Sequence, residues 1–186
     1  MRIRLAAIIC LCFLFSGCGN GGASLDKAIL LRNSILNSNG CSFQTTITAD
    51  YGEKIYIFSM DCTADKDGNL AFTVTEPGTI AGITGKITAT GGAITFDDQV
   101  LAFQTVADGQ LSPVAAPWLL IRTLRSGYLK DVAASDTGLQ ISIDDSYDDD
   151  ALQLQIRTDG QSPVFGEVFW NGRRVLTLAV ENFTIL

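Results

Sequence analysis

The chain has 186 residues, with 13 Lys and Arg against 20 Asp and Glu and no His, so its formal net charge is −7. An acidic chain is a poor partner for nucleic acid or for an anionic membrane surface, because like charges repel. The absence of His excludes Ser-His-Asp and Cys-His nucleophilic mechanisms and every metal site built on imidazole ligands. We therefore expect no enzyme, no cofactor and no nucleic-acid partner.

Residues 1–18 have the pattern of a bacterial export signal. Two Arg lie near the start, and an apolar stretch over 5–15 follows that is too short for a permanent membrane span. The sequence Phe15-Ser-Gly-Cys18 resembles a lipobox, although Phe15 stands where Leu is usual. The resemblance implies cleavage after residue 17 and acylation of Cys18 by fatty acids such as palmitate. Ordinary secretion with cleavage nearby is the alternative.

Removal of residues 1–17 takes away two cations and no acid, so the mature chain of 169 residues carries a net charge of −9. A chain of that length fits one domain with a sizeable core. We expect a signal peptide over 1–17, a lipidated N-terminus and linker over 18–23, and a single domain over 24–186. Lipid on Cys18 would anchor this domain to a bacterial membrane on its extracytoplasmic side, in the cell envelope.

The first expected element of the domain is an amphipathic helix over 24–38. Ser24 suits the N-cap position, apolar residues then recur at helical spacing, and Asn39-Gly40 supplies a stop signal. A second, short helix is predicted over 117–126, because Pro117 stands near its start and cations lie in its last turn.

The remainder of the domain shows the alternation of apolar and polar residues, with regularly spaced turn residues, that is typical of antiparallel β structure. About 11 strands are expected, at 41–49, 54–63, 69–76, 83–89, 92–96, 99–106, 128–134, 139–144, 151–157, 163–170 and 173–183. We predict a mainly β fold of α+β type. Its strongly curved antiparallel sheet would form a half-open β-barrel, and the two helices would cover the concave face.

The first two strands allow a prediction of register. If Tyr51-Gly52 is a two-residue turn, Phe43 lies opposite Met60, and Cys41 lies opposite Cys62. Directly opposed Cβ atoms are about 4.5–5.5 Å apart, which is close enough for a disulfide after modest adjustment. Because exported proteins often meet an oxidising compartment, we expect a Cys41–Cys62 disulfide. Two buried free thiols are the alternative.

The segment Asp144–Asp150 concentrates five carboxylates in seven residues. Carboxylate oxygens on a turn could hold calcium, but the spacing is not that of an EF-hand loop. A solvated hairpin loop is the favoured interpretation, so we predict no metal site, with calcium binding as the alternative.

The order of these elements, behind a lipobox, resembles the superfamily of bacterial lipoprotein-localisation factors and related lipoproteins (LolA, LolB, LppX, LprG and RseB). The likeness is one of layout over 24–186, helped by local sequences such as CSFQTTIT followed by IYIFSMDC, and GEVFWNGRRVLTLAVENF near the end. It implies a half-open β-barrel with a helical lid and an apolar concavity that holds acyl chains or lipids. The acidic turn Ala64–Gly68 departs from the soluble carrier, in which a basic residue takes part in lid closure, so that role is not carried over.

The leading hypothesis is a non-catalytic, membrane-anchored lipoprotein that binds or hands off an apolar ligand, such as an acyl chain, a lipid or a lipoprotein acyl group, in a concave cavity. The expected lining residues are Phe43, Ile47, Tyr56, Phe58, Met60, Phe72 and Phe103. The alternative is an envelope protein-interaction or sensor module similar to RseB, in which the half-barrel is a scaffold for a protein partner. A roomy cavity would favour the first hypothesis, whereas a filled interior beside an uncovered strand edge would favour the second.

Overall fold

The computed structural model describes residues 21–186, apart from 53, 97, 104–105 and 108–109. The predicted signal peptide and Cys18 therefore lie outside the described residues. Within the described part of the chain, no helix has both the length and the apolar character needed to cross a membrane.

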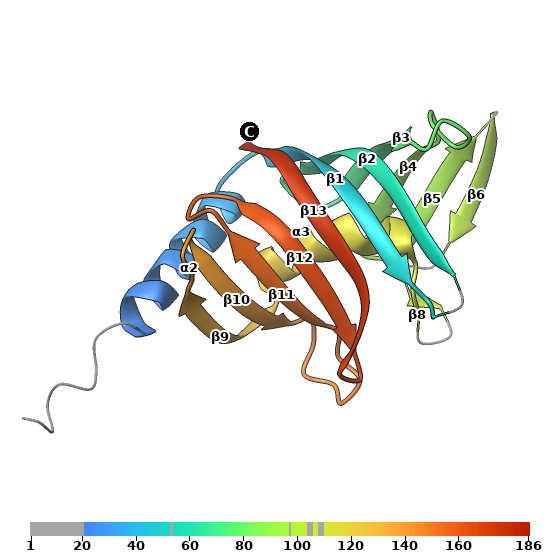
Figure 1. Cartoon of the computed structure of the whole chain (residues 1–186). Coiled ribbons are helices and arrows are strands. Elements are labelled where there is room, and N and C mark those ends of the chain that lie inside the picture. Colours follow the sequence, from blue (N-terminus) through green and yellow to red (C-terminus); the bar gives the residue numbers. More distant parts are fainter. Residues whose placement is uncertain (1–20, 53, 97, 104–105, 108–109) are drawn as a thin grey trace, which may run out of the picture.

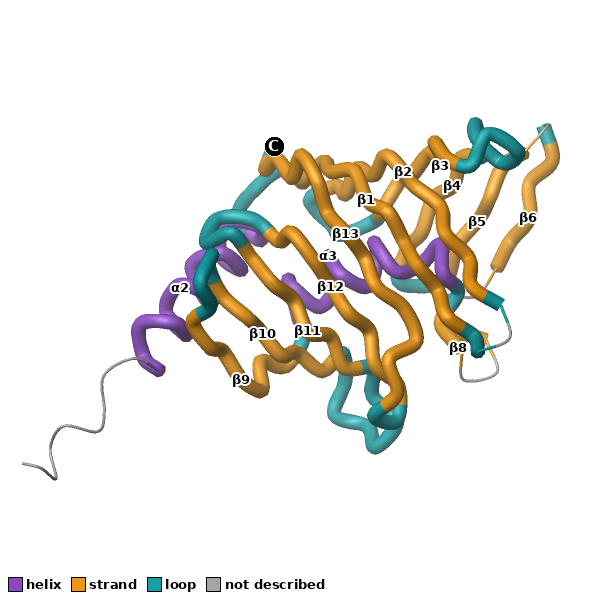
Figure 2. Tube along the Cα trace, in the orientation of Figure 1, coloured by secondary structure: helices purple, strands orange, loops and turns teal. Residues whose placement is uncertain are grey.

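One antiparallel sheet of 11 strands makes up most of the domain, in the order β6-β5-β4-β3-β2-β1-β13-β12-β11-β10-β9. Figures 1 and 2 show that this sheet curves around a helix and stays open, with β6 near one end of the molecule and β9 near the other. The mainly β class, the strand number and the half-open barrel predicted from the sequence are confirmed. The strands are β1 (Gly40–Asp50), β2 (Ile55–Asp65), β3 (Leu70–Glu76), β4 (Thr84–Thr88), β5 (Gly91–Phe96), β6 (Gln99–Phe103), β9 (Tyr128–Ala134), β10 (Leu139–Asp144), β11 (Gln153–Thr158), β12 (Pro163–Trp170) and β13 (Arg173–Ile185).

The predicted strand over 99–106 is described as β6 up to Phe103, and residues 104–105 of the prediction lie outside the described residues. A separate two-stranded ladder follows it, formed by β7 (Val106–Ala107) and β8 (Gln110–Leu111). A short 3-10 helix, η1 (Pro113–Ala115), leads from this ladder into the mid-chain helix.

The mid-chain helix, α3 (Ala116–Ser126), agrees with the prediction to within one residue. It lies in the concavity against β2, β10 and β13 (Figure 1). Its apolar side chains are almost fully sequestered from water. The buried members are Ala116, Pro117, Trp118, Leu119, Leu120, Ile121 and Leu124. α3 therefore fills much of the half-barrel.

The N-terminal helix, α2 (Gly21–Leu36), begins three residues before the predicted start, so its first turn occupies part of the predicted linker. Ser24 is buried inside the helix and does not cap it. It shares the packed face of α2 with Ala28, Leu31 and Ile35. Packing of this face against the sheet therefore outweighs the local preference of Ser for a cap position.

Arg32 connects the two helices. Its Nε donates to the carbonyl of Leu124 at 2.8 Å, and its Nη2 donates to the carbonyls of Gly127 at 2.8 Å and Thr123 at 3.3 Å. Carbonyls at a helix C-terminus lack intrahelical partners and attract positive charge. This contact holds α2 against the C-terminal end of α3.

The register of the first hairpin differs from the prediction by two residues. Asp50 pairs with Ile55, so the connection is four residues long, and the Tyr51 N–H donates to the carbonyl of Lys54 at 3.1 Å. Phe43 consequently lies opposite Cys62 and not opposite Met60. Because side chains alternate with a period of two, a shift of two residues leaves every side chain on the predicted face.

The same shift makes the two cysteines diagonal neighbours, since Cys41 pairs with Ala64. The prediction that the two cysteines lie directly opposite each other was therefore wrong. Both thiols are free and buried. Diagonal neighbours are about 7–8 Å apart, slightly beyond the usual Cα range of a disulfide. Burial raises the pKa of Cys41 to about 11 and raises that of Cys62 as well. A disulfide between them stays a prediction, and it would require a local backbone shift.

Candidate functional site

One row of cross-strand neighbours runs over the concave face from the middle of the sheet to the β6 edge. The row consists of Phe43, Cys62, Phe72, Gly85, Ile94 and Leu101. Its first three members are each only 3% exposed, Ile94 is partly buried, and Leu101 is 68% exposed. The apolar concave face therefore continues beyond the part of the sheet that is covered.

A second row of cross-strand neighbours lies beside the first, but it ends in a partly buried side chain, that of Phe103. It consists of Cys41, Ala64, Leu70, Ile87, Gly92 and Phe103. The Phe103 ring lies over Gly92, so a Cβ at that glycine would overlap the ring, and Phe72 covers Gly85 in the same manner. Glycine on one strand thus makes room for an aromatic ring on the next.

We refer to β5 and β6 together as the wing. Figure 1 shows that these strands extend past the end of α3. Phe96 is 54% exposed, and its cross-strand partner is Gln99. Apolar side chains that stay exposed on the inner face of a curved sheet form the kind of patch that marks an interaction site.

On the opposite, convex face of the wing, Val100 is the large apolar residue that is exposed among the described residues. Val100 pairs with Thr95 and is 67% exposed. The next residues along this convex row are Thr84 and Thr73, so the row is polar until it reaches β6. Val100 and Leu101 are therefore equally exposed neighbours that point to opposite faces of the same edge strand.

A partly enclosed, mainly apolar hollow lies at the hairpin end of the half-barrel, and we call it the mouth pocket. Its volume is about 240 Å³. Its walls are Tyr51, Leu111, Leu152, Trp170 and Val175, with Asp50, Asn171 and Arg173 also contributing. Pockets for small ligands usually have volumes of about 300–1,000 Å³, so the mouth pocket has room for only part of an acyl chain.

Tyr51 fixes one wall of the mouth pocket. Its hydroxyl donates to the carbonyl of Leu111 at 3.1 Å, which ties the first hairpin to β8. Burial raises the pKa of the Tyr51 hydroxyl, with a further contribution from the nearby Tyr56. The two rings lie edge to face, with centroids 6.1 Å apart.

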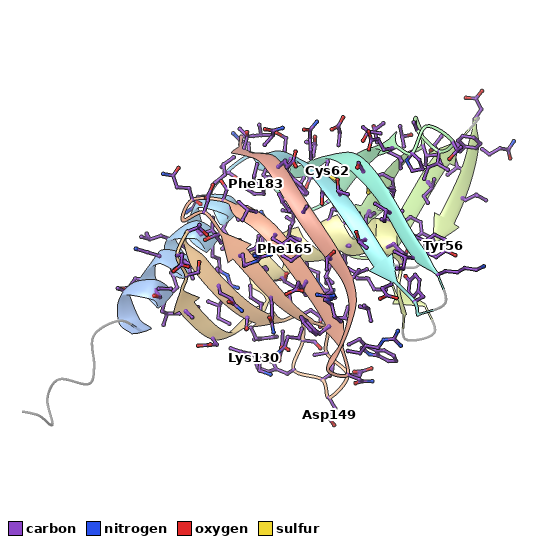
Figure 3. The ribbon with its side chains drawn as sticks, in the orientation of Figure 1. Tyr56, Cys62, Lys130, Asp149, Phe165 and Phe183 are labelled. Atoms are coloured by element: carbon purple, nitrogen blue, oxygen red, sulfur yellow. The ribbon has the colours of Figure 1, made fainter. Side chains whose placement is uncertain are left out.

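The seven predicted lining residues fall into two groups. Five belong to the buried core, namely Phe43, Ile47, Phe58, Met60 and Phe72. Tyr56 is 48% exposed near the hairpin end of β2, whereas Cys62 lies toward the other end (Figure 3), and Phe103 is partly buried in the wing. None of the seven lines the mouth pocket. As ligand contacts all seven stay predictions.

The expected lining residues did not include Phe96, Val100 or Leu101, although the alternation in the sequence places Phe96 and Leu101 on the apolar face of their strands. The alternation of apolar residues was visible in the sequence, but it does not show where the cover by α3 ends. Exposure at these positions follows from that tertiary arrangement alone.

The acidic segment forms the loop between β10 and β11, and Asp149 lies at its outer end (Figure 3). Lys130 pairs with Asp144 at 2.9 Å, and the Asp145 carboxylate accepts a hydrogen bond from the Leu152 N–H at 2.8 Å. Among the residues that the structure describes, no group of three or more His, Cys, Asp or Glu is arranged to hold a metal ion.

No known family profile matches the chain, and no curated protein sequence matches it. Among solved structures, it is similar to a LolA superfamily protein from Nitrosomonas europaea, with 11% identity over 91% of this chain and 94% of that chain and a TM-score of 0.46. It is also similar to a putative outer membrane lipoprotein-sorting protein domain from Vibrio parahaemolyticus, with 8% identity, coverage of 89% and 93%, and a TM-score of 0.49.

A third similar structure is the MucA/MucB complex of Pseudomonas aeruginosa, at 14% identity and a TM-score of 0.39. The match covers 86% of this chain and 56% of that chain. The LolA superfamily, which the layout of the sequence resembles, is the one named for the first of these structures. At these identities and TM-scores the likeness carries no information about what this chain binds.

Proposed function

We propose that this protein is a lipid-anchored, extracytoplasmic binding protein without catalytic activity, and that an apolar ligand binds to the concave face of its wing. The observation that carries this proposal is the exposure of Leu101 at the end of a row whose other end is buried core. Covering exposed apolar surface contributes about 25 cal/mol per Å². The lipobox-like sequence before Cys18 supports the anchor and the signal peptide over 1–17.

The ligand class is an acyl chain or a lipid that carries one. The covered part of the concavity is filled by α3, and the mouth pocket of about 240 Å³ holds only part of such a chain. The open surface of the wing does not limit the length of the acyl chain that binds to it. A chain lying along Phe96 and Leu101 would bury both side chains without any movement of α3.

The test is titration of the purified protein with a fluorescent fatty acid that carries a dansyl group, together with native mass spectrometry of protein prepared without detergent. Two matched variants show which face of β6 contributes to binding: Leu101→Ser changes the concave face, and Val100→Ser changes the convex face. Both positions are exposed to the same extent, so neither substitution should disturb the core.

We expect Leu101→Ser to weaken binding roughly tenfold, because contact with one leucine side chain contributes about 1.5 kcal/mol. Val100→Ser should change the affinity less than about twofold. An unchanged affinity for Leu101→Ser would show that the wing is not the binding surface.

A second candidate follows from the alternative hypothesis of a protein-interaction module, and here the partner would be an envelope protein that binds the β6 edge. The exposed Val100 favours it specifically, because a ligand confined to the concave face leaves this side chain in water. An extended partner segment that adds a strand to β6 would cover Val100 and Leu101 together. A photo-crosslinking residue placed at 100 and then at 101 would capture the same protein from both positions if this candidate is correct, and from neither if it is wrong.

A further inference from the structure

The N-terminal helix is apolar on more of its surface than its packing requires. Ala28, Leu31 and Ile35 pack against the rest of the domain. Large apolar residues also lie on the exposed side, namely Leu25, Ile29, Leu30 and Leu36, with Leu30 at 66% exposure. Polar residues such as Asp26, Lys27 and Asn33 are exposed as well, so α2 is not apolar all round, but an amphipathic helix normally buries its large apolar side chains. The domain itself leaves one side of α2 uncovered.

The position of α2 in the chain indicates what covers that side. Gly21, the first residue of the helix, is three residues after Cys18. Three residues span at most about 10 Å when fully extended. If Cys18 is acylated and its chains lie in a bilayer, the first turns of α2 must lie at the surface of that bilayer.

We propose that the outer surface of α2, defined by Leu25, Ile29 and Leu30, lies in the interface of the bilayer beside the lipid on Cys18. This inference rests on the anchor that is part of the proposed function. The first ten residues of α2 contain two charged residues, Asp26 and Lys27, whose charges cancel. A mature chain with a net charge of −9 gains nothing from anionic lipid, so burial of apolar side chains drives this contact.

This contact would also fix the orientation of the whole domain. α2 packs against β9, at one end of the sheet, and Arg32 ties it to α3. The wing lies at the other end of the sheet (Figure 2). With α2 in the bilayer interface, the wing points away from the anchoring membrane and faces the compartment.

The experiment compares two labelled positions of equal exposure, Leu30→Cys on α2 and Val100→Cys on β6, at 66% and 67%. Each variant is used as the lipidated mature chain, carries the environment-sensitive fluorophore NBD and is reconstituted into phosphatidylcholine vesicles. The native thiols of Cys41 and Cys62 are buried and do not compete for the label. Vesicle flotation reports the lipid anchor independently of the helix.

We expect the label at residue 30 to shift its emission to shorter wavelength on vesicles, and the label at residue 100 to keep the emission that it has in water. Adding Leu25→Ser and Ile29→Ser to the protein labelled at residue 30 should remove most of the shift, with an unchanged thermal unfolding curve as the folding control. Emission at residue 30 that is unchanged in protein that floats overturns the docking of α2 and leaves the anchor standing. Protein that does not float lacks the anchor, so the docking of α2 and the anchor of the proposed function fail together, whereas ligand binding by the wing is decided by the fatty-acid titration. A shift at residue 100 in place of residue 30 shows the opposite orientation.

Discussion

The covered and the uncovered parts of the concave face are built from the same kinds of residue. Phe72 is 3% exposed and Leu101 is 68% exposed, although both belong to one cross-strand row. Both residues point to the same face of the sheet, so neither the alternation of side chains nor the strand register explains the difference in exposure. They differ because Phe72 belongs to the buried core cluster beside the part of the sheet that α3 packs against, whereas β5 and β6 extend past the end of α3 (Figure 1). A leucine that stays 68% exposed contributes little to the stability of the fold, which is why the wing is the better candidate for binding.

The largest expected effect comes from comparing a Leu→Ala substitution on the covering helix α3 with the same substitution in the wing. Leu120 on α3 is 0% exposed, so Leu120→Ala should lower the free energy of unfolding by about 2–5 kcal/mol through lost burial and a residual cavity. Leu101→Ala should change it by no more than about 0.5 kcal/mol. Urea unfolding of both variants measures the difference. Equal destabilisation would mean that the wing is part of the core.

Glycines beneath aromatic rings give the next largest effect. Gly85→Ala would force the Phe72 ring away from a buried position, and we expect a loss of about 1–3 kcal/mol from overpacking. Gly92→Ala meets the Phe103 ring in the same way, but that ring is only partly buried and can move toward solvent. We expect Gly92→Ala to cost less than Gly85→Ala in thermal unfolding. The reverse order would show that Phe103 is held as firmly as Phe72.

Removing the hydrogen bonds by which Arg32 joins α2 to α3 should loosen the packing of α2 and leave the wing unaffected. Arg32→Met keeps most of the aliphatic stem but leaves the carbonyls of Leu124 and Gly127 without their donor, which should cost about 1–2 kcal/mol. Hydrogen exchange should become faster in α2 and unchanged in the wing. Arg32→Lys is the control, because it keeps the charge and can make one of these hydrogen bonds. Faster exchange spread evenly over the chain would contradict a local role for Arg32.

These expectations also show what the sequence could and could not predict. Alternation of apolar residues assigned side chains such as Phe43 and Met60 to the buried face, and that assignment survived a register error of two residues because the period is two. The error came from the length of the turn after Asp50, where a four-residue connection replaces the expected two. The reach of α3 over the sheet is set by tertiary packing and has no local signal, so the exposure of Leu101 could not be read from the chain.

The smallest expected effect concerns a carboxylate beside the covering helix. Burial raises the pKa of Asp145 above its ordinary value of 3.8, although the Leu152 N–H and Arg122 act in the opposite direction. Because its pKa is raised, the Asp145 carboxyl stays protonated to a higher pH in the folded protein than in the unfolded chain, where it loses its proton near pH 3.8. Stability contributed by Asp145 therefore falls as the pH rises through that range, and it stays lower at neutral pH.

Asp145→Asn removes this penalty and keeps an oxygen that can accept the Leu152 N–H. At pH 7 we expect the variant to be at least as stable as the native protein, with a gain within about 0.5 kcal/mol. The advantage should disappear below pH 3.8, where Asp145 is protonated in both the folded and the unfolded state. Urea midpoints at the two pH values test this, with Asp148→Asn in the same loop as the control. A variant that is clearly less stable at pH 7 would show that the ion pair with Arg122, at 3.9 Å, outweighs the burial of the carboxylate under the covering helix.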